Sequence, residues 1–237
     1  MSTKAEDFKE YLESNGIQPK YFQKKEFIFS QWEPNEYCIF LHEGVAKLTS
    51  ISESGDILNL QYYKGAFIIM TGFIDTEKSL GYYNLEVVSE QAVAYIIKIS
   101  DLKELVSKDL KQLFYIIDTL QKQVSYSLAK FNDFSSNGKV GSICGQFLIL
   151  AYVYGEETPN GIKITLEKLT MQELGCSSGI AHSSAVSRII SKLKQENVIE
   201  YKDSYFYIKN IAYLKKIAPK IDEWFYLACH NSWDQFN

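Results

Sequence analysis

The period of the apolar residues changes near residue 100, and this change limits the folds that the chain can adopt. Residues 20–99 contain short runs rich in aromatic and β-branched side chains, such as EFIF, YCIFLHEGVAKLTSI, ILNLQYY and AVAYIIKI, separated by turn signals. Short strands at this spacing predict a compact antiparallel barrel or roll. Beyond residue 100, apolar residues recur every seven positions, at Leu110, Ile117, Val124 and Phe131. The two patterns together predict an α+β chain.

The seven-residue repeat predicts a long helix that begins at Ser100 and Asp101 and continues to about Phe134. A stripe of this length suits one helix that pairs with its twin, so we expect a homodimer. The predicted dimer interface contains Leu110, Leu113, Ile117, Leu120, Val124 and Phe131. The alternative is a helix that lies on its own barrel, for which Phe114, Tyr126 and Leu128 are available.

The pattern changes near residue 100 and breaks again at residues 137–141, which we interpret as a hinge or domain boundary. A short helix is expected at residues 5–15, and Asn137-Gly138-Lys139-Val140-Gly141 interrupts the long helix. After this break the sequence predicts an apolar helix at about 141–155, the strand GIKITL and two short helical segments within about 170–196. The hairpin VIEY-KDS-YFYI and a helical tail follow.

The composition fits a protein of two domains without a membrane span. The chain has 237 residues, of which 46% are apolar, so it can bury sizeable cores. Its strongest apolar run, FLILAYVY, is far shorter than the roughly 20 residues that cross a bilayer. The N-terminus MSTKAEDFKE does not resemble a signal peptide, and the four cysteines lack metal-type spacing. These features predict a cytoplasmic protein with reduced thiols.

The basic charge is concentrated near the stretch GIAHSSAVSRIISKLKQE. The net charge of the chain is −4, and residues 1–100 hold nine Lys/Arg against fourteen Asp/Glu. Residues 182–216 instead hold seven Lys/Arg against three Asp/Glu. A local basic surface of this kind is what a phosphate-facing segment needs, although a solvated helix face has the same composition.

The serines and histidine of this stretch do not predict catalysis. His182 and Ser183 are adjacent in sequence, so their side chains leave a helix start in different directions. No GxSxG, HExxH, carboxylate pair or dinucleotide fingerprint occurs. We therefore expect no enzyme activity, no catalytic cofactor and no metal site.

A helix-turn-helix fits the stretch better. LTMQELG gives a first helix, and CSSGIAH gives a turn in which Gly179 takes an unusual backbone angle. In a second helix, with His182 or Ser183 as N-cap, Ala185, Val186, Ile189, Ile190 and Leu193 share one face. The predicted DNA-binding residues are Ser183, Ser184, Ser187, Arg188, Lys192, Lys194 and Lys202.

These residue types suit contacts with double-stranded DNA. Serine bonds to a base or a phosphate, whereas arginine can contact guanine O6 and N7 with two parallel bonds. Residues near the start of such a helix meet base edges, so Arg188 is the predicted base reader. Lys192 and Lys194 lie where the helix leaves toward the sugar-phosphate backbone, and Lys202 belongs to the hairpin that forms a wing.

Three segments carry a resemblance to a known family. YCIFLHEGVAKLT is similar to an early β-roll segment, residues 108–134 to a dimerisation helix and AVSRIISKLKQENVI to a recognition helix of the Crp/Fnr family of bacterial transcription regulators. The resemblance implies a cyclic-nucleotide-binding-like β-roll sensor domain at 1–107, a linker and dimerisation helix at 108–137 and a winged helix-turn-helix domain at 138–237. It also implies a homodimeric activator that binds palindromic promoter DNA and recruits RNA polymerase.

The chain departs from the family members that bind cyclic AMP. A cyclic phosphate is held by arginine, but residues 65–82 contain none. The segments NLQYYKGAF and TLQKQVSYSLAKFNDFS are instead similar to a virulence-gene activator of the family, which implies reduced glutathione as the allosteric ligand. The effector residues that this resemblance implies are Gln61, Tyr62, Tyr63, Lys64, Ala66, Phe67, Lys122, Gln123, Tyr126 and Trp224.

The implied residues have a chemical rationale. A strand edge at 61–67 can pair with the backbone of an extended tripeptide, and Lys64 and Lys122 can neutralise its carboxylates. Tyr126 and Trp224 can equally be packing residues. Two other functions stay open: a small-molecule sensor that acts as a repressor or through protein contacts, and a redox switch based on Cys38, Cys144, Cys176 or Cys229.

Overall fold

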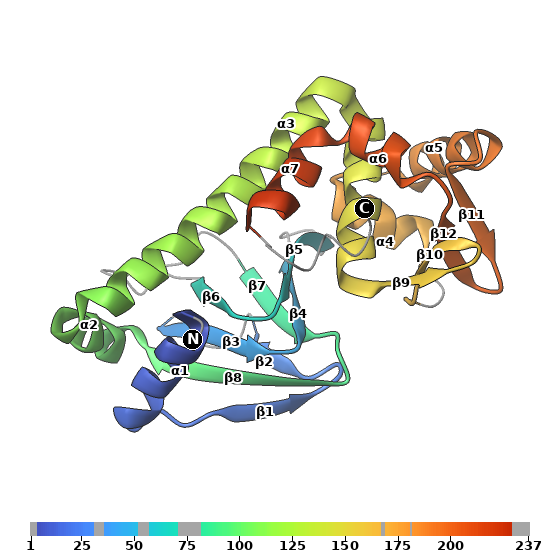
Figure 1. Ribbon diagram of the computed structural model, residues 1–237. Coiled ribbons are helices and arrows are strands. Elements are labelled where there is room, and N and C mark those ends of the chain that lie inside the picture. The colour runs from blue at the N-terminus through green and yellow to red at the C-terminus, as the bar shows by residue number, and fades with distance from the viewer. Residues whose placement is uncertain are drawn as a thin grey trace. The chain divides into compact units, whose positions relative to one another are not determined.

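The computed structural model describes residues 4–30, 36–51, 57–70, 82–166, 169–180 and 182–228 (Figure 1). The chain forms two compact units, Met1–Gln121 and Lys122–Asn237, and each has its own core. The predicted α+β class is confirmed, with antiparallel sheets, a long helix and C-terminal helices. None of the helices in the described ranges has the length and apolar character needed to span a membrane.

Two four-stranded antiparallel sheets form the roll of the first unit. One has the order β1 (Lys20–Gln23), β8 (Gln91–Lys98), β3 (Tyr37–Glu43) and β6 (Phe67–Met70). The other has the order β2 (Phe27–Phe29), β7 (Tyr82–Val87), β4 (Val45–Ile51) and β5 (Ile57–Lys64). The sequence predicted all of these strands except β1, a short edge strand whose Tyr21 is 74% exposed.

The central strand β3 is buried on both faces. Successive side chains of a strand point to opposite sides, so Cys38 and Phe40 lie on one face and Ile39 and Leu41 on the other. All four are at most 1% exposed. At the turn into β4, Gly44 has φ 93°, and a Cβ there would lie 2.5 Å from the carbonyl oxygen of Gln91. Glycine is therefore required at this close approach.

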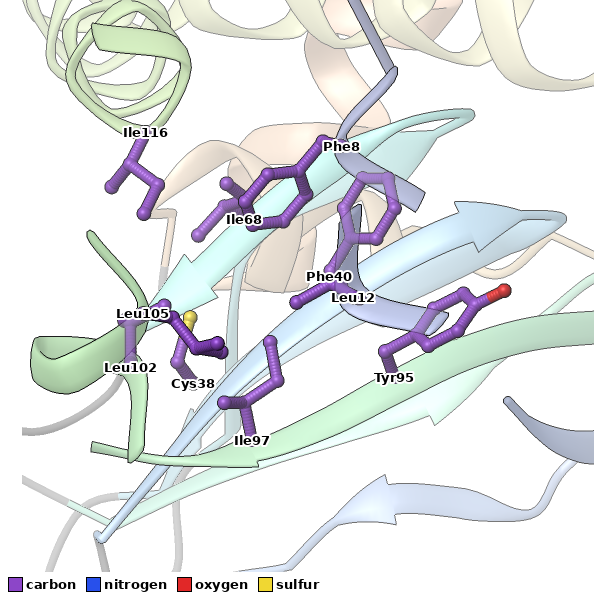
Figure 2. Packing of buried hydrophobic residues seen from close by; sticks show 10 residues of the cluster. All are labelled: Phe8, Leu12, Cys38, Phe40, Ile68, Tyr95, Ile97, Leu102, Leu105 and Ile116. Carbon is purple, nitrogen blue, oxygen red and sulfur yellow. The ribbon is translucent and has the colours of Figure 1, made fainter. Parts of the chain in front are cut away.

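Helices cover the Cys38 face of this sheet. α1 (Lys4–Ser14), predicted at 5–15, inserts Phe8 and Leu12, and α2 (Ile99–Lys108) contributes Leu102 and Leu105. Figure 2 shows Phe8 and Leu12 beside Phe40, and Leu102 and Leu105 beside Cys38. The ring centroids of Phe8 and Phe40 lie 5.0 Å apart in an edge-on arrangement. This cluster is the core that ties the helices to the roll.

The helix predicted from 100 to 134 is instead two helices. α2 ends at Lys108, and its C-cap Asp109 has an extended backbone with φ −143°. α3 then runs from Leu110 to Tyr154. The Asp109 carboxylate accepts bonds from the backbone N–H of Lys111 (2.9 Å) and the side-chain amide of Gln112 (3.0 Å), so it caps α3. The break predicted at 137–141 lies within α3, where Gly138 has φ 56° and ψ −144°.

The second unit combines the rest of α3 with a small sheet and four helices. The sheet has the order β11 (Ile199–Lys202), β12 (Tyr205–Ile208), β10 (Gly161–Ile164) and β9 (Gly155–Thr158). The helices are α4 (Met171–Ser178), α5 (Ser183–Gln195), α6 (Ile211–Ile217) and α7 (Pro219–Ala228). Phe147 of α3 packs on Phe206 of β12, with ring centroids 5.4 Å apart. The sequence predicted these elements apart from β9.

Candidate DNA-recognition site

The first helix of the predicted helix-turn-helix is α4, which begins with a capping box. The backbone N–H of Glu173 donates to Oγ1 of Thr170 (3.1 Å), and the N–H of Thr170 donates to the Glu173 carboxylate (2.8 Å). The sequence predicted that this helix ends at Gly175, which is wrong, because it continues through Cys176 and Ser177 to Ser178. It ends where Gly179 takes the left-handed conformation, with φ 67° and ψ 29°, as predicted for that glycine.

Gly175 lies where α4 meets the turn and α5. A Cβ at this position would be 2.6 Å from the carbonyl oxygen of Ile180 and 3.4 Å from Cγ2 of Val186. The first distance is too short for real atoms, so only glycine fits here. Gly175 therefore brings α4 and α5 close together.

The second helix, α5, has the two faces that the sequence predicted. Val186, Ile190 and Leu193 are at most 2% exposed, since the three- and four-residue spacing puts them on one side. The side chains of α5 that were predicted to contact DNA are all exposed: Ser183, Ser184, Ser187, Arg188, Lys192 and Lys194.

The start of α5 lies where the sequence predicted it. His182 is the N-cap, with φ −102° and ψ 111°, and its side chain makes no capping hydrogen bond. The backbone N–H groups of the first turn are therefore not occupied by a capping side chain. Such groups, together with the helix dipole, favour an anion such as a phosphate.

The cationic side chains around α5 differ in how they are engaged. Arg188, the only arginine in the chain, is exposed and forms no ion pair within the residues that the structure covers. Lys192 lies 3.7 Å from the Glu196 carboxylate. The Lys194 ammonium lies 5.2 Å from the ring centroid of Tyr201 and 5.7 Å from that of Phe206. Arg188 is thus the charge of this helix most available to a ligand.

The predicted wing is the hairpin of β11 and β12. Its two central turn residues, Asp203 and Ser204, have φ 51° and 69°, the positive values of a tight hairpin turn whose twist matches that of the strands. Lys202 precedes them and is exposed. The hairpin is held to α5 through Lys194 over Tyr201.

The predicted effector residues fall into two sets on different compact units. Gln61 to Lys64 lie on β5, which is an edge strand, and Phe67 begins β6 after Ala66. Gln61 and Tyr63 are buried within the roll, while Tyr62, Lys64 and Ala66 are partly exposed. The side-chain nitrogen of Gln61 has no hydrogen-bond partner among the described residues.

The second set lies on α3 and α7. The indole N–H of Trp224 donates to the backbone carbonyl of Lys122 (3.0 Å), and the rings of Trp224 and Tyr126 lie 5.0 Å apart at 67°. Both aromatic side chains are buried, whereas Lys122 and Gln123 are partly exposed. The assembly of the two sets into one site stays a prediction.

The predicted dimer interface is largely an exposed stripe on α3. Leu110, Ile117, Val124 and Phe131 are 62%, 47%, 60% and 66% exposed. Leu113 is partly buried, and Leu120 packs against the core of the roll. Phe114 and Leu128 are exposed in their place, at 66% and 56%. The stripe therefore follows 110, 114, 117, 124, 128 and 131, in steps of three and four around the exposed Gln121.

The described residues also bear on a metal site, which the sequence did not predict, and on the redox switch that the sequence left open. Within those ranges no three His, Cys, Asp or Glu side chains come together in a way that could hold a metal ion. Burial raises the pKa of the Cys38 and Cys144 thiols to about 12, which keeps both in the protonated, unreactive form. Cys176 is partly buried, and Cys229 lies outside the described residues.

Comparison with known proteins identifies the class to which this architecture belongs. No family model matches the chain. A transcriptional regulator of the CRP family from Thermus thermophilus superposes with a TM-score of 0.67, at 18% identity over 84% of this chain and 96% of that one. A c-di-GMP-responsive global regulator from Xanthomonas campestris superposes with a TM-score of 0.70, at 15% identity over 86% of this chain and 98% of that one.

A closer sequence relative shows the family. The listeriolysin regulatory protein of Listeria monocytogenes is 73% identical over 237 residues, which cover both chains completely. The lactate racemization regulatory protein of Lactiplantibacillus plantarum is 24% identical over 86% of this chain and 92% of its own. The chain belongs to the Crp/Fnr family of transcriptional regulators, as the sequence resemblance predicted.

Proposed function

We propose that this regulator is a homodimeric activator that binds palindromic promoter DNA in a sequence-specific manner. The observation that carries the proposal is α5, which buries Val186 and Ile190 in its own unit and presents Arg188 together with the three serines to solvent. An amphipathic helix with short polar groups and one arginine on its free face fits the major groove.

Base recognition would centre on Arg188. Its planar guanidinium can donate two parallel bonds to guanine O6 and N7. Ser183 and Ser184 begin the helix, where long side chains would keep the backbone from approaching a phosphate. Lys202 in the wing adds a contact with the sugar-phosphate backbone.

Dimerisation would follow from the exposed stripe on α3. Six large apolar side chains on one helix face are a typical coiled-coil seam. A two-fold dimer presents two copies of α5, so the operator is a palindrome whose half-sites are about 10 base pairs apart. By analogy with the family, the bound dimer recruits RNA polymerase. Because the relative is named as a regulator of listeriolysin, we propose that this chain regulates virulence genes. We also propose that it acts in the cytoplasm.

Reduced glutathione is the proposed allosteric ligand. The strand β5 lies at the edge of its sheet, where an extended peptide can add as a further strand, and Lys64 and Lys122 can offer their ammonium groups to its carboxylates. Cyclic AMP is disfavoured because the only arginine in the chain, Arg188, lies on α5, and residues 1–121 contain none. The ligand would favour the arrangement in which both α5 helices face DNA.

The test begins with duplexes selected from a randomised library by the wild-type chain. We expect a palindrome that is bound at least tenfold more tightly than its scrambled sequence. Equal binding of the two duplexes would refute the proposed function. Titration calorimetry with reduced glutathione and, separately, with cyclic AMP then tests the ligand. If cyclic AMP gives a heat of binding and reduced glutathione gives none, the proposal of glutathione as the allosteric ligand is refuted.

A further inference from the structure

The C-terminal end of α4 is held by side chains of α3. The Lys130 ammonium donates to the carbonyl oxygen of Ser177 (3.2 Å), and the Ser142 hydroxyl donates to that of Ser178 (2.7 Å). These carbonyl groups belong to the last turn of α4, where no further N–H of the helix can reach them. The long helix therefore completes the hydrogen bonding of the first helix of the helix-turn-helix.

Both hydrogen bonds are partly shielded from water, and a hydrogen bond is stronger in such a less polar environment. Ser177 and Ser178 are 5% exposed, and the Lys130 ammonium lies 5.6 Å from the ring centroid of Tyr126. A cation at a helix C-terminus also interacts favourably with the helix dipole. A single side chain, Lys130, thus supplies both a donor and a charge to the end of α4.

The orientation of α4 determines that of α5. A Cβ on Gly175 of α4 would touch both Ile180 in the turn and Val186 in α5, so the two helices are in direct contact at this point. A tilt of α4 must be followed by α5, because close-packed elements do not deform independently.

We propose that Lys130 and Ser142 are positioning residues for DNA recognition, which fix α4 so that α5 presents Arg188 in the geometry that reads base edges. The inference rests on the proposed DNA-binding function. It assigns a task to the part of α3 from Lys130, at the end of the proposed dimer seam, to Ser142 beyond it: the same helix that would join two copies also sets the angle of the reading helix.

Five variants test this role, two at serines and three at lysines. Ser142→Ala removes the hydroxyl that holds α4, and Ser127→Ala removes a hydroxyl of the same helix that bonds only within α3, to Gln123 (3.2 Å). Lys130→Met removes the ammonium and its donor, Lys130→Arg keeps a charge and a donor, and Lys139→Met removes an exposed lysine of the same helix.

The measurement is the affinity of each variant for the selected palindrome and for its scrambled duplex, with circular dichroism and light scattering to verify fold and mass. We expect Ser142→Ala to weaken binding to the palindrome roughly fivefold and Lys130→Met on the order of 20-fold. Binding to the scrambled duplex should stay within about twofold, because phosphate contacts do not need the base-reading angle. Lys130→Arg should recover most of the loss, and the two control variants should match the wild type.

Three results would overturn the inference. Palindrome binding by Ser142→Ala and Lys130→Met that equals the wild type would show that α4 needs no such support. An equal loss on both duplexes would show a structural role only. A wild-type chain that does not prefer the palindrome would overturn this inference together with the proposed function, which separates that failure from the other two.

Discussion

Arg188 is the one side chain of this protein that can present a guanidinium, since all the other basic residues are lysines. Lysine is a point charge, whereas arginine offers a planar fork that matches the guanine edge. Because Arg188 is exposed on α5 and forms no ion pair in the described part of the chain, we assign the proposed base reading to this residue.

Arg188→Ala should therefore abolish discrimination between the selected palindrome and its scrambled duplex, at a cost of roughly 1–3 kcal/mol of specific binding free energy. Arg188→Lys is the control, because it keeps the charge but not the fork, and should retain only the non-specific affinity. A band-shift titration measures both. Discrimination at the wild-type level in Arg188→Ala would contradict the assignment.

Lys202 and Lys194 should differ in their effect on the salt dependence of DNA binding. Lys202→Ala should reduce the slope of log K against log salt by about one unit, as expected for one lost phosphate contact. Lys194→Ala should change it less, since the Lys194 ammonium already lies over Tyr201 and Phe206. Fluorescence anisotropy at several salt concentrations tests this, and equal slopes for the two variants would contradict it.

Gly175→Ala should destabilise the second unit by about 1–3 kcal/mol, because the new Cβ would collide with the Ile180 carbonyl and force the backbone to shift. Gly179→Asn is a suitable control, since nothing lies within 4 Å of its Cβ and asparagine tolerates the left-handed conformation. Urea unfolding measures both changes. A larger loss in Gly179→Asn than in Gly175→Ala would contradict this account.

At the scale of elements, the exposed stripe of α3 predicts which substitution converts the proposed dimer into monomers. Val124→Glu places a charge at the centre of the stripe and should yield a monomeric mass in light scattering, because a buried unpaired carboxylate is costly. Ser125→Glu adds the same charge next to the stripe but off it, and should stay dimeric. A dimeric Val124→Glu variant would place the interface elsewhere.

The sequence predicted which helices and strands form better than it predicted where they end and which other elements they contact. The roll, the recognition helix, the wing and Gly179 follow from period and turn chemistry, which are local. The break at Asp109 was missed although DLKQ carries its signal: an aspartate followed three residues later by a glutamine, whose side chains bond to each other. An unbroken apolar repeat concealed it.

Other features depend on contacts that no local pattern encodes. Leu113 and Phe114 are both apolar, so the repeat does not say which one is exposed, and the choice is made by the core that receives Leu120. Lys130 and Ser177 are separated by 47 positions, and their contact appears only after the second unit has formed. The same holds for Asp133, which caps α7 by accepting from the N–H groups of Lys220 (3.0 Å) and Ile221 (2.9 Å).

At the scale of the whole molecule, the desolvated ammonium group of Lys130 makes the free energy of unfolding depend on pH. Burial lowers the pKa of Lys130 to about 8, and Asp133 lines the same small cavity as Lys130. Its pKa in the unfolded chain is about 10.4. The folded protein therefore carries the cost of a charged, partly buried ammonium below pH 8. Above this pH the folded state releases the proton first, so stability attributable to Lys130 rises between pH 8 and about 10.

The comparison of wild type with Lys130→Arg isolates this contribution, because arginine stays charged and all other titrating groups are shared. Relative to the variant, the wild type should gain about 1–2 kcal/mol of unfolding free energy between pH 7.5 and 9.5. Urea unfolding at both pH values measures the difference. A constant or decreasing difference would show that the ammonium is not desolvated.

The stripe on α3 contains one amide, Gln121, between Ile117 and Val124. In a parallel pair of these helices, each Gln121 meets its twin and the two amides can bond to each other. Sliding one helix by seven residues would set the amide against Phe114 or Leu128 and leave its polar atoms without partners. In the proposed dimer, this single polar layer would set the register of the two helices. Through that register, the side chain at position 121 would set how many base pairs separate the two halves of the proposed operator.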